Sequence, residues 1–224
     1  MEERELPVGW TTTQLGDIIE DIEAGKNLRC NEQPPENDEE GIVKVSAVSW
    51  GSFREEESKT VLPGTQLDPR AEIKQGDLLF SRANTIELVG ACVQVEAISK
   101  RLFLSDKILR LVAHDDLKSW IKSYLSSPAA RLALSEASSG NQLSMRNISQ
   151  KALLAIEAPL APLNEQRRIA SKLNTTLASV DACRQRLEGV ATLLKRFRQA
   201  VLEAATSGEL TREWREEIGA QTPW

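Results

Sequence analysis

The fold is decided by residues 164–205, NEQRRIASKLNTTLASVDACRQRLEGVATLLKRFRQAVLEAA. This stretch contains no proline and a single glycine, Gly189. Apolar or small side chains recur in it in alternating steps of four and three, which is the heptad pattern of a coiled-coil helix. We call this row the seam, and it comprises Ile169, Leu173, Thr176, Val180, Cys183, Leu187, Val190, Leu194, Phe197, Val201 and Ala204.

The seam requires a second helix. At 1.5 Å per residue the helix is roughly 63 Å long, so it cannot bury an apolar edge within itself. Asn164 is the expected N-cap, and Ser207-Gly208 is the expected end. The alternative is a long amphipathic helix that lies on its own globular domain. The unbroken register over five to six heptads favours the coiled coil.

The remainder has the composition of a globular protein. Of the 224 residues, 41% are hydrophobic and 27% are charged, which suits one domain of ordinary size beside the helix. The acidic N-terminus shows no signal-peptide pattern, and no apolar run approaches the ~18 residues of a membrane span. The three cysteines are far apart in the sequence. Buried reduced thiols and a cytoplasmic location are therefore expected.

The charge is distributed unevenly along the chain. A net charge of −5 argues at first against a nucleic-acid ligand. However, residues 1–58 carry 15 acids and 5 bases, a balance of −10, whereas residues 59–163 carry +3 and residues 164–205 carry +4. Most of the chain can therefore present a basic face to phosphates. The acidic first quarter also leaves open an inhibitor that mimics DNA.

The sequence predicts an α+β fold, in which a globular mixed or curled β-sheet domain is followed by the long coiled-coil-forming helix. A short helix is expected at residues 15–22, ahead of Gly25. Two further helices are expected, one at residues 115–125 and one that begins at Pro128. Strands are expected at residues 42–50, 78–82, 89–96, 101–113 with a break at Ser105-Asp106, and 154–161.

Motifs of catalytic chemistry are missing from the sequence. It contains no GxGxxG, P-loop, HExxH or GxSxG, and no Cys/His spacing that would hold a metal. Asp77 and Glu87 could form a nuclease-like pair, but no lysine follows them at the required spacing. The chain is therefore predicted to bind rather than to catalyse, without a metal or cofactor of its own.

Four segments in order resemble one family, the DNA-specificity (S) subunit of type I restriction–modification enzymes. The most specific is GNQLSMRNISQKALLAIEAPLAPLNEQRRIASKL, residues 140–173, in which Asn147-Ile148-Ser149 and Glu165-Gln166 lead into a spacer helix in the family's order. The others are LPVGWTTTQLGDII at 6–19, GDLLFSRANTIELVG at 76–90 and LEAATSGELTREWR at 202–215.

The resemblance implies three parts. Residues 1–160 are expected to form a DNA target-recognition domain that reads one half of a bipartite target. Residues 161–207 are expected to form the spacer and dimerisation helix, and residues 208–224 a C-terminal tail. Family members usually carry two recognition domains and two such helices. This chain, with one of each, is therefore expected to be either a natural half-subunit or the N-terminal half of a longer protein.

The resemblance also implies partners. The working enzyme needs methyltransferase (M) subunits, which bind S-adenosylmethionine and methylate adenine, and ATP-driven restriction (R) subunits. This chain would direct them to double-stranded DNA and would pair through its helix with a second copy of itself or with the second half of a longer chain. The competing hypothesis is a non-catalytic coiled-coil dimerisation or regulatory protein without DNA sequence specificity.

Two polar turns carry the side chains that suit base reading, since arginine recognises guanine and asparagine recognises adenine. The expected DNA-facing residues are Arg82, Asn84 and Thr85 in the first turn and Gln142, Ser144, Arg146 and Asn147 in the second. Alternatively, either arginine pairs with an acidic neighbour and Asn147 caps a helix. Phosphate contacts are expected from Lys26, Lys44, Lys107 and Arg110.

Overall fold

The structure is a computed structural model that describes residues 6–36, 39–140, 145–217 and 219. The chain divides into two compact units, unit 1 (Met1–Ala170) and unit 2 (Ser171–Trp224). Within the described residues, no helix has both the length and the hydropathy needed to cross a membrane.

Unit 1 is built on two four-stranded sheets. One is wholly antiparallel, in the order β2 (Asp21–Ala24), β10 (Ile108–Val112), β6 (Leu78–Ser81) and β8 (Cys92–Gln94). The other has the order β3 (Cys30–Asn31), β5 (Ser58–Val61), β4 (Glu40–Val43) and β9 (Arg101–Phe103). Because β4 and β9 are parallel, this sheet is mixed, and the expected α+β class is confirmed.

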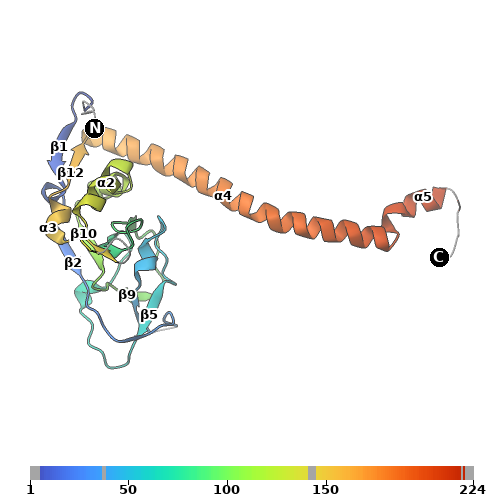
Figure 1. Cartoon of the computed structure of the whole chain (residues 1–224), viewed down its shortest axis with the longest axis horizontal. Coiled ribbons are helices and arrows are strands. Elements are labelled where there is room, and N and C mark those ends of the chain that lie inside the picture. The colour runs from blue at the N-terminus through green and yellow to red at the C-terminus, as the bar shows by residue number, and fades with distance from the viewer. Residues whose placement is uncertain (1–5, 37–38, 141–144, 218, 220–224) are drawn as a thin grey trace. The chain divides into compact units, whose positions relative to one another are not determined.

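The described residues of unit 1 also form two short strand pairs and three short helices, several of which are labelled in Figure 1. In the strand pairs, β1 (Thr11–Gln14) pairs with β12 (Glu157–Leu160), and β7 (Ala83–Asn84) pairs with β11 (Arg146–Asn147). The helices are α1 (Asp115–Leu125), α2 (Pro128–Ala137) and α3 (Gln150–Leu154). The 3-10 turns are Leu15–Asp17, Val45–Val48 and Pro69–Ala71.

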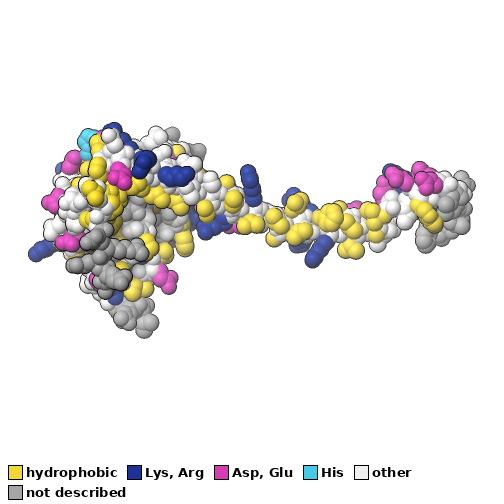
Figure 2. Space-filling view, turned by 90° about the horizontal axis from the view of Figure 1, so that it is seen from above, with side chains coloured by type: hydrophobic (Ala, Val, Ile, Leu, Met, Phe, Trp, Pro, Cys, Tyr) yellow, Lys and Arg dark blue, Asp and Glu magenta, His cyan; other side chains and the backbone are white. Residues whose placement is uncertain are grey.

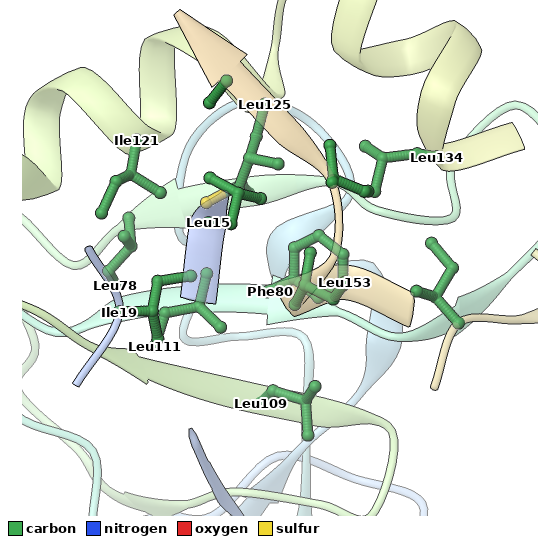
Figure 3. Packing of buried hydrophobic residues seen from close by; sticks show 14 of the residues in the cluster. Leu15, Ile19, Leu78, Phe80, Leu109, Leu111, Ile121, Leu125, Leu134 and Leu153 are labelled. Carbon is green, nitrogen blue, oxygen red and sulfur yellow. The ribbon is translucent and has the colours of Figure 1, made fainter. Parts of the chain in front are cut away.

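The antiparallel sheet is buried on both faces, because its side chains alternate between two hydrophobic clusters. On one face Leu78 and Phe80 of β6 join a cluster with α1, α2 and α3 (Figure 3). On the other face Leu79 and Ile108 join a second cluster. All four side chains are fully buried, and each contributes about 1.5–3 kcal/mol of transfer free energy. The central strands β6 and β10 therefore form a rigid support for the turn that follows β6 and for the turn that precedes β10.

The helices of unit 1 begin where local side chains satisfy their first N–H groups. Ser127 Oγ accepts from the Ala130 amide at 3.3 Å at the start of α2, where Pro128 holds the first helical position. Ser149 Oγ does the same for the Ala152 amide of α3 at 3.1 Å. The predicted helices at residues 115–125 and from Pro128 are confirmed.

Two of the predicted secondary-structure elements were wrong. Residues 15–22 do not form a helix, because a 3-10 turn at Leu15–Asp17 leads directly into β2, where Ile22 pairs with Leu111 of β10. Likewise the strand expected at residues 42–50 ends at Val43 and continues as a 3-10 turn. In the first case the apolar spacing fits a helix, but hydrogen bonds to the sheet replace the helical ones.

The long helix α4 (Leu163–Thr206) has 44 residues and extends the predicted helix by one residue at each end. Glu165 lies in its first turn, but Asn164 is already inside the helix and is therefore not the N-cap that the sequence had predicted. Gly208 follows the helix with a φ of +76°, the left-handed conformation that terminates helices. A short helix, α5 (Arg212–Glu217), follows.

The seam of α4 is exposed in the single chain. Leu187 is 71% exposed, Phe197 is 63% exposed and Leu194 is 52% exposed, whereas Ile169 at the start of the seam is half-buried. Figure 2 shows hydrophobic side chains along this helix with basic side chains between them. A row of large apolar side chains in water is typical of a protein–protein interaction surface.

Candidate nucleic-acid interface

The two polar turns singled out in the sequence are brought together by the strand pair β7–β11. Asn84 lies opposite Arg146, and Ala83 lies opposite Asn147. Arg82 Nε donates to Asn147 Oδ1 at 3.2 Å. The Arg82 carbonyl accepts from the Ile148 amide at 2.8 Å. Segments about sixty residues apart in the sequence therefore form one polar surface.

The amide of Asn84 is fixed by its neighbours. Its Nδ2 donates to Ser49 Oγ at 3.0 Å, and its Oδ1 accepts from the Thr85 amide at 2.8 Å. Ser49 Oγ in turn donates to the Val45 carbonyl at 2.8 Å. The side chains of Thr85 and Asn147 are exposed at this surface. Asn147 does not cap α3, because that position is filled by Ser149.

Arg146 lies against the end of α2. Its Nε donates to Ser138 Oγ at 2.8 Å, and its Nη2 donates to the carbonyls of Ser135 and Ser138 at 2.8 and 2.7 Å. These carbonyls lie at the C-terminal end of α2, where the helix dipole favours a cation. This geometry favours a role in which Arg146 holds β11 against α2. Gln142 and Ser144 lie outside the described residues.

Four lysines line one open cavity of about 270 Å³, which we call the lysine cavity. They are Lys26, Lys44, Lys59 and Lys107. Lys44 Nζ donates to the Glu32 carbonyl oxygen at 3.0 Å, and Lys59 Nζ pairs with the Glu32 carboxylate at 2.6 Å. Three of these lysines were expected to contact phosphates, and the fold places them in one concave region.

The electrostatics of the lysine cavity favour an anion. The hydrogen bond from Lys59 lowers the pKa of Glu32, so that this carboxylate stays paired. Burial raises the pKa of Cys30, which also lines the cavity, so its thiol stays uncharged at neutral pH. Asp106 contributes a carboxylate to the lining, whereas the four lysines contribute four ammonium groups.

The lysine cavity and the strand pair are continuous through the main chain. The Arg82 amide donates to the Lys107 carbonyl at 3.0 Å, directly beyond the pairing of Ser81 with Ile108. Cations suited to phosphates therefore lie next to side chains suited to base edges. Both groups rest on the buried strands β6 and β10.

Arg110 was wrongly expected to contact phosphates. Its guanidinium pairs with the carboxylates of Glu23 and Asp77, the latter at 2.8 Å, and also donates to the carbonyls of Arg70 and Glu72. The side chain is only 12% exposed. Asp77 is therefore part of an internal ion pair, and its pairing with Arg110 replaces the nuclease-like role weighed above.

Two residues of this candidate interface were not predicted from the sequence. Lys59 lies in β5, and Ser49 follows a 3-10 turn. Their contributions depend on pairing between segments that are distant in the chain. Alternation in β5 indicates which side chains share a face, but it does not indicate that this face meets Lys107.

Comparison with known proteins places the chain in a family. Residues 7–191 match the Type I restriction modification DNA specificity domain, and the chain belongs to this family. It is 32% identical over 205 residues to the Type I restriction enzyme EcoEI specificity subunit of Escherichia coli, covering 90% of this chain and 34% of that protein. It is 42% identical over 96 residues to the EcoKI specificity subunit of Escherichia coli strain K12, covering 43% and 20% respectively.

Solved structures share the fold. The HsdS subunit from Thermoanaerobacter tengcongensis superposes with a TM-score of 0.57 at 24% identity, over 91% of this chain and 46% of that one. A chain from a structure of the assembly and conformational transition of the type I R-M system gives a TM-score of 0.59 at 23% identity, over 91% and 47%. The chain thus spans about a third of the EcoEI subunit and about half of the solved chains.

Proposed function

We propose that unit 1 reads one half of a bipartite DNA target for a type I restriction–modification enzyme. The observation that carries this proposal is the continuity of the lysine cavity with the strand pair β7–β11, in a chain of the DNA specificity family. Phosphate contacts fix the register of a protein on duplex DNA, and base contacts specify the sequence.

The proposed phosphate contacts come from the lysine cavity. Lys26 and Lys107 supply the main charges, with Lys44 oriented by Glu32. Such contacts release counterions and give binding that weakens steeply with salt.

The proposed base contacts come from the strand pair. Arg82 presents its terminal nitrogens while its Nε is held by Asn147, and such a fork suits the O6 and N7 atoms of guanine. Thr85 and Asn147 are exposed beside it. Asn84 is oriented by Ser49, and Arg146 positions β11. Gln142 and Ser144, which lie outside the described residues and close to Arg146 in the sequence, remain proposed base contacts.

The proposed division of the chain follows from these roles. Residues 1–160 recognise DNA, residues 161–207 space and pair the recognition domains, and residues 208–224 form a tail. The chain performs no catalysis itself and directs M and R subunits in the cytoplasm. Its partner at the seam is a second copy or the second half of a longer chain.

The ion pairs formed by the acidic first quarter argue against a protein that mimics DNA. Several of its carboxylates are used inside unit 1, where they pair with basic side chains. The pairs are Glu23 with Arg110, Glu32 with Lys59 and Glu56 with Lys100. A surface that imitates DNA needs its charges unpaired.

The proposal is tested by selection from a random duplex library at 0.15 M salt. The wild-type chain is expected to enrich a defined motif, and Arg82→Lys, which keeps the charge but removes the planar fork, is expected to relax preference at individual base pairs by about 1–3 kcal/mol. Thr11→Ser, in β1, serves as the matched control. Failure of the wild type to enrich any motif, alone and with an M subunit, would favour the regulatory coiled-coil protein.

A further inference from the structure

Two loops beside the strand pair β7–β11 each expose one large apolar side chain. Trp50 lies in residues 49–54, which we call the Trp50 loop, and it is 56% exposed. Ile86 lies in residues 85–89, which we call the Ile86 loop, and it is 40% exposed. A single exposed apolar side chain is common on a protein surface, so the exposure of these two is informative only where the backbone fixes it.

The Trp50 loop is held by contacts within unit 1. The Arg54 amide donates to the Ala47 carbonyl at 3.0 Å, which closes the loop, and Phe53 packs against the second hydrophobic cluster. The Arg54 guanidinium lies 5.8 Å from the centre of the Trp50 ring, a favourable contact between a cation and an aromatic face. One aromatic side chain of this loop therefore anchors it, and the other stays in solvent.

The Ile86 loop is held in a similar way. The Val89 amide donates to the Thr85 carbonyl at 2.8 Å. From α2, Arg131 donates to the carbonyls of Glu87 and Val89, both at 2.6 Å. The Val89 side chain is fully buried in the first hydrophobic cluster. This loop therefore also has one apolar side chain inside unit 1 and one, Ile86, in solvent.

The side chain of Asn84 joins the two loops. Its Nδ2 donates to Ser49 Oγ of the Trp50 loop at 3.0 Å, and its Oδ1 accepts from the Thr85 amide of the Ile86 loop at 2.8 Å. Both loops also line one open cavity of about 170 Å³, to which the first contributes Gly51 and the second Leu88. The loops therefore lie next to each other, and each presents its exposed apolar side chain close to Asn84.

Charge next to these loops favours the edges of bases over phosphates. Glu87 also lines the shared cavity, and a carboxylate repels a phosphate. Cations for phosphates lie in the lysine cavity, which is joined to Ser49 by the 3-10 turn Val45–Val48. Arg82, two residues before Asn84, has the fork that suits guanine in the major groove. The apolar group that the major groove offers beside such a contact is the C5 methyl group of thymine.

We propose that Trp50 and Ile86 together hold the C5 methyl group of a thymine in the half-site, beside the base pair that Arg82 reads. This inference rests on the proposed function of unit 1 and adds two specificity-determining residues to it. Contact with a methyl group removes apolar surface from water on both sides. Because both loops are already fixed, binding orders little backbone. The half-site therefore contains at least one A·T pair that is read through its thymine.

Removal of the methyl group alone tests this inference. In the motif that the wild-type full chain selects, each thymine is replaced in turn by deoxyuridine, and affinity is measured by competition in fluorescence anisotropy. At one thymine the replacement is expected to weaken wild-type binding about fourfold, the effect of about one buried methyl group. In Trp50→Ala/Ile86→Ala the same replacement is expected to leave affinity unchanged. Leu62→Ala, which removes a similarly exposed side chain directly after β5, is the matched control and should keep the fourfold loss.

The outcomes separate this inference from the proposed function. A selected motif without A·T pairs, a motif in which no deoxyuridine weakens binding, or a fourfold loss that persists in Trp50→Ala/Ile86→Ala would overturn this inference alone. If that double variant kept the thymine effect but lost capture of an M subunit, the two side chains would belong to a protein interface instead. Failure of the wild type to enrich any motif would overturn the proposed function and this inference with it.

Discussion

Removal of two amino groups from the lysine cavity gives the sharpest prediction for DNA binding. Lys44 and Lys59 are held by Glu32, so Lys26 and Lys107 are the informative positions. Each phosphate contact adds about 0.9 to the slope of log affinity against log salt. Lys26→Ala/Lys107→Ala is therefore expected to reduce this slope by about 1.8.

This change has a measurable consequence. Between 50 and 200 mM salt, a slope difference of about 1.8 means that the wild type loses about twelvefold more affinity than the double variant. Fluorescence anisotropy with a labelled duplex measures both slopes. Lys74→Ala removes an exposed lysine that does not line the lysine cavity and serves as the control. An unchanged slope in the double variant, or an equal change in the control, would refute the assignment of phosphate contacts to this cavity.

Three further predictions concern the interior of unit 1 and one of its thiols. Arg146→Ala should lower the free energy of unfolding by about 1–3 kcal/mol in urea titration, because the carbonyls at the end of α2 lose a charged donor. A loss confined to DNA discrimination, with stability unchanged, would contradict the positioning role. Arg110→Met should destabilise unit 1 by about 3 kcal/mol, since it leaves two partly buried carboxylates without their cation; a change below about 1 kcal/mol would contradict that reasoning. At pH 8 Cys92 should react with a thiol reagent only after unfolding, because burial raises its pKa to about 12 and little thiolate forms. Fast modification of Cys92 in the native chain would show that its surroundings open.

Much of the fold could be predicted because its strongest signals are local. Each of these signals is carried by residues that are close together in the sequence. They are the seam of α4, Pro128 at the start of α2, and the break between β9 and β10. The segment at residues 15–22 could not be predicted in this way. Its apolar spacing fits a helix, and only pairing of β2 with β10, almost ninety residues away in the sequence, makes part of it a strand.

The candidate site was predictable in part for the same reason. The polar turns around Arg82 and Asn147 stand out by composition, but their contact depends on the pairing of β7 with β11. An arginine in a sequence does not reveal its partners. Arg110 lies among carboxylates from distant segments, and Arg146 lies at a helix end. Of the basic residues that were predicted to contact phosphates, Lys26, Lys44 and Lys107 meet in the lysine cavity, where Lys59 joins them.

The central claim is that two copies of unit 1, joined by paired α4 helices, read two separated half-sites. Hydroxyl-radical footprinting of the full chain at saturating concentration, on a duplex that carries the selected motif as an inverted repeat, tests this claim most directly. The account predicts two protected tracts in inverted orientation with an unprotected gap of fixed length between them. A single contiguous protected half-site under these conditions would contradict it.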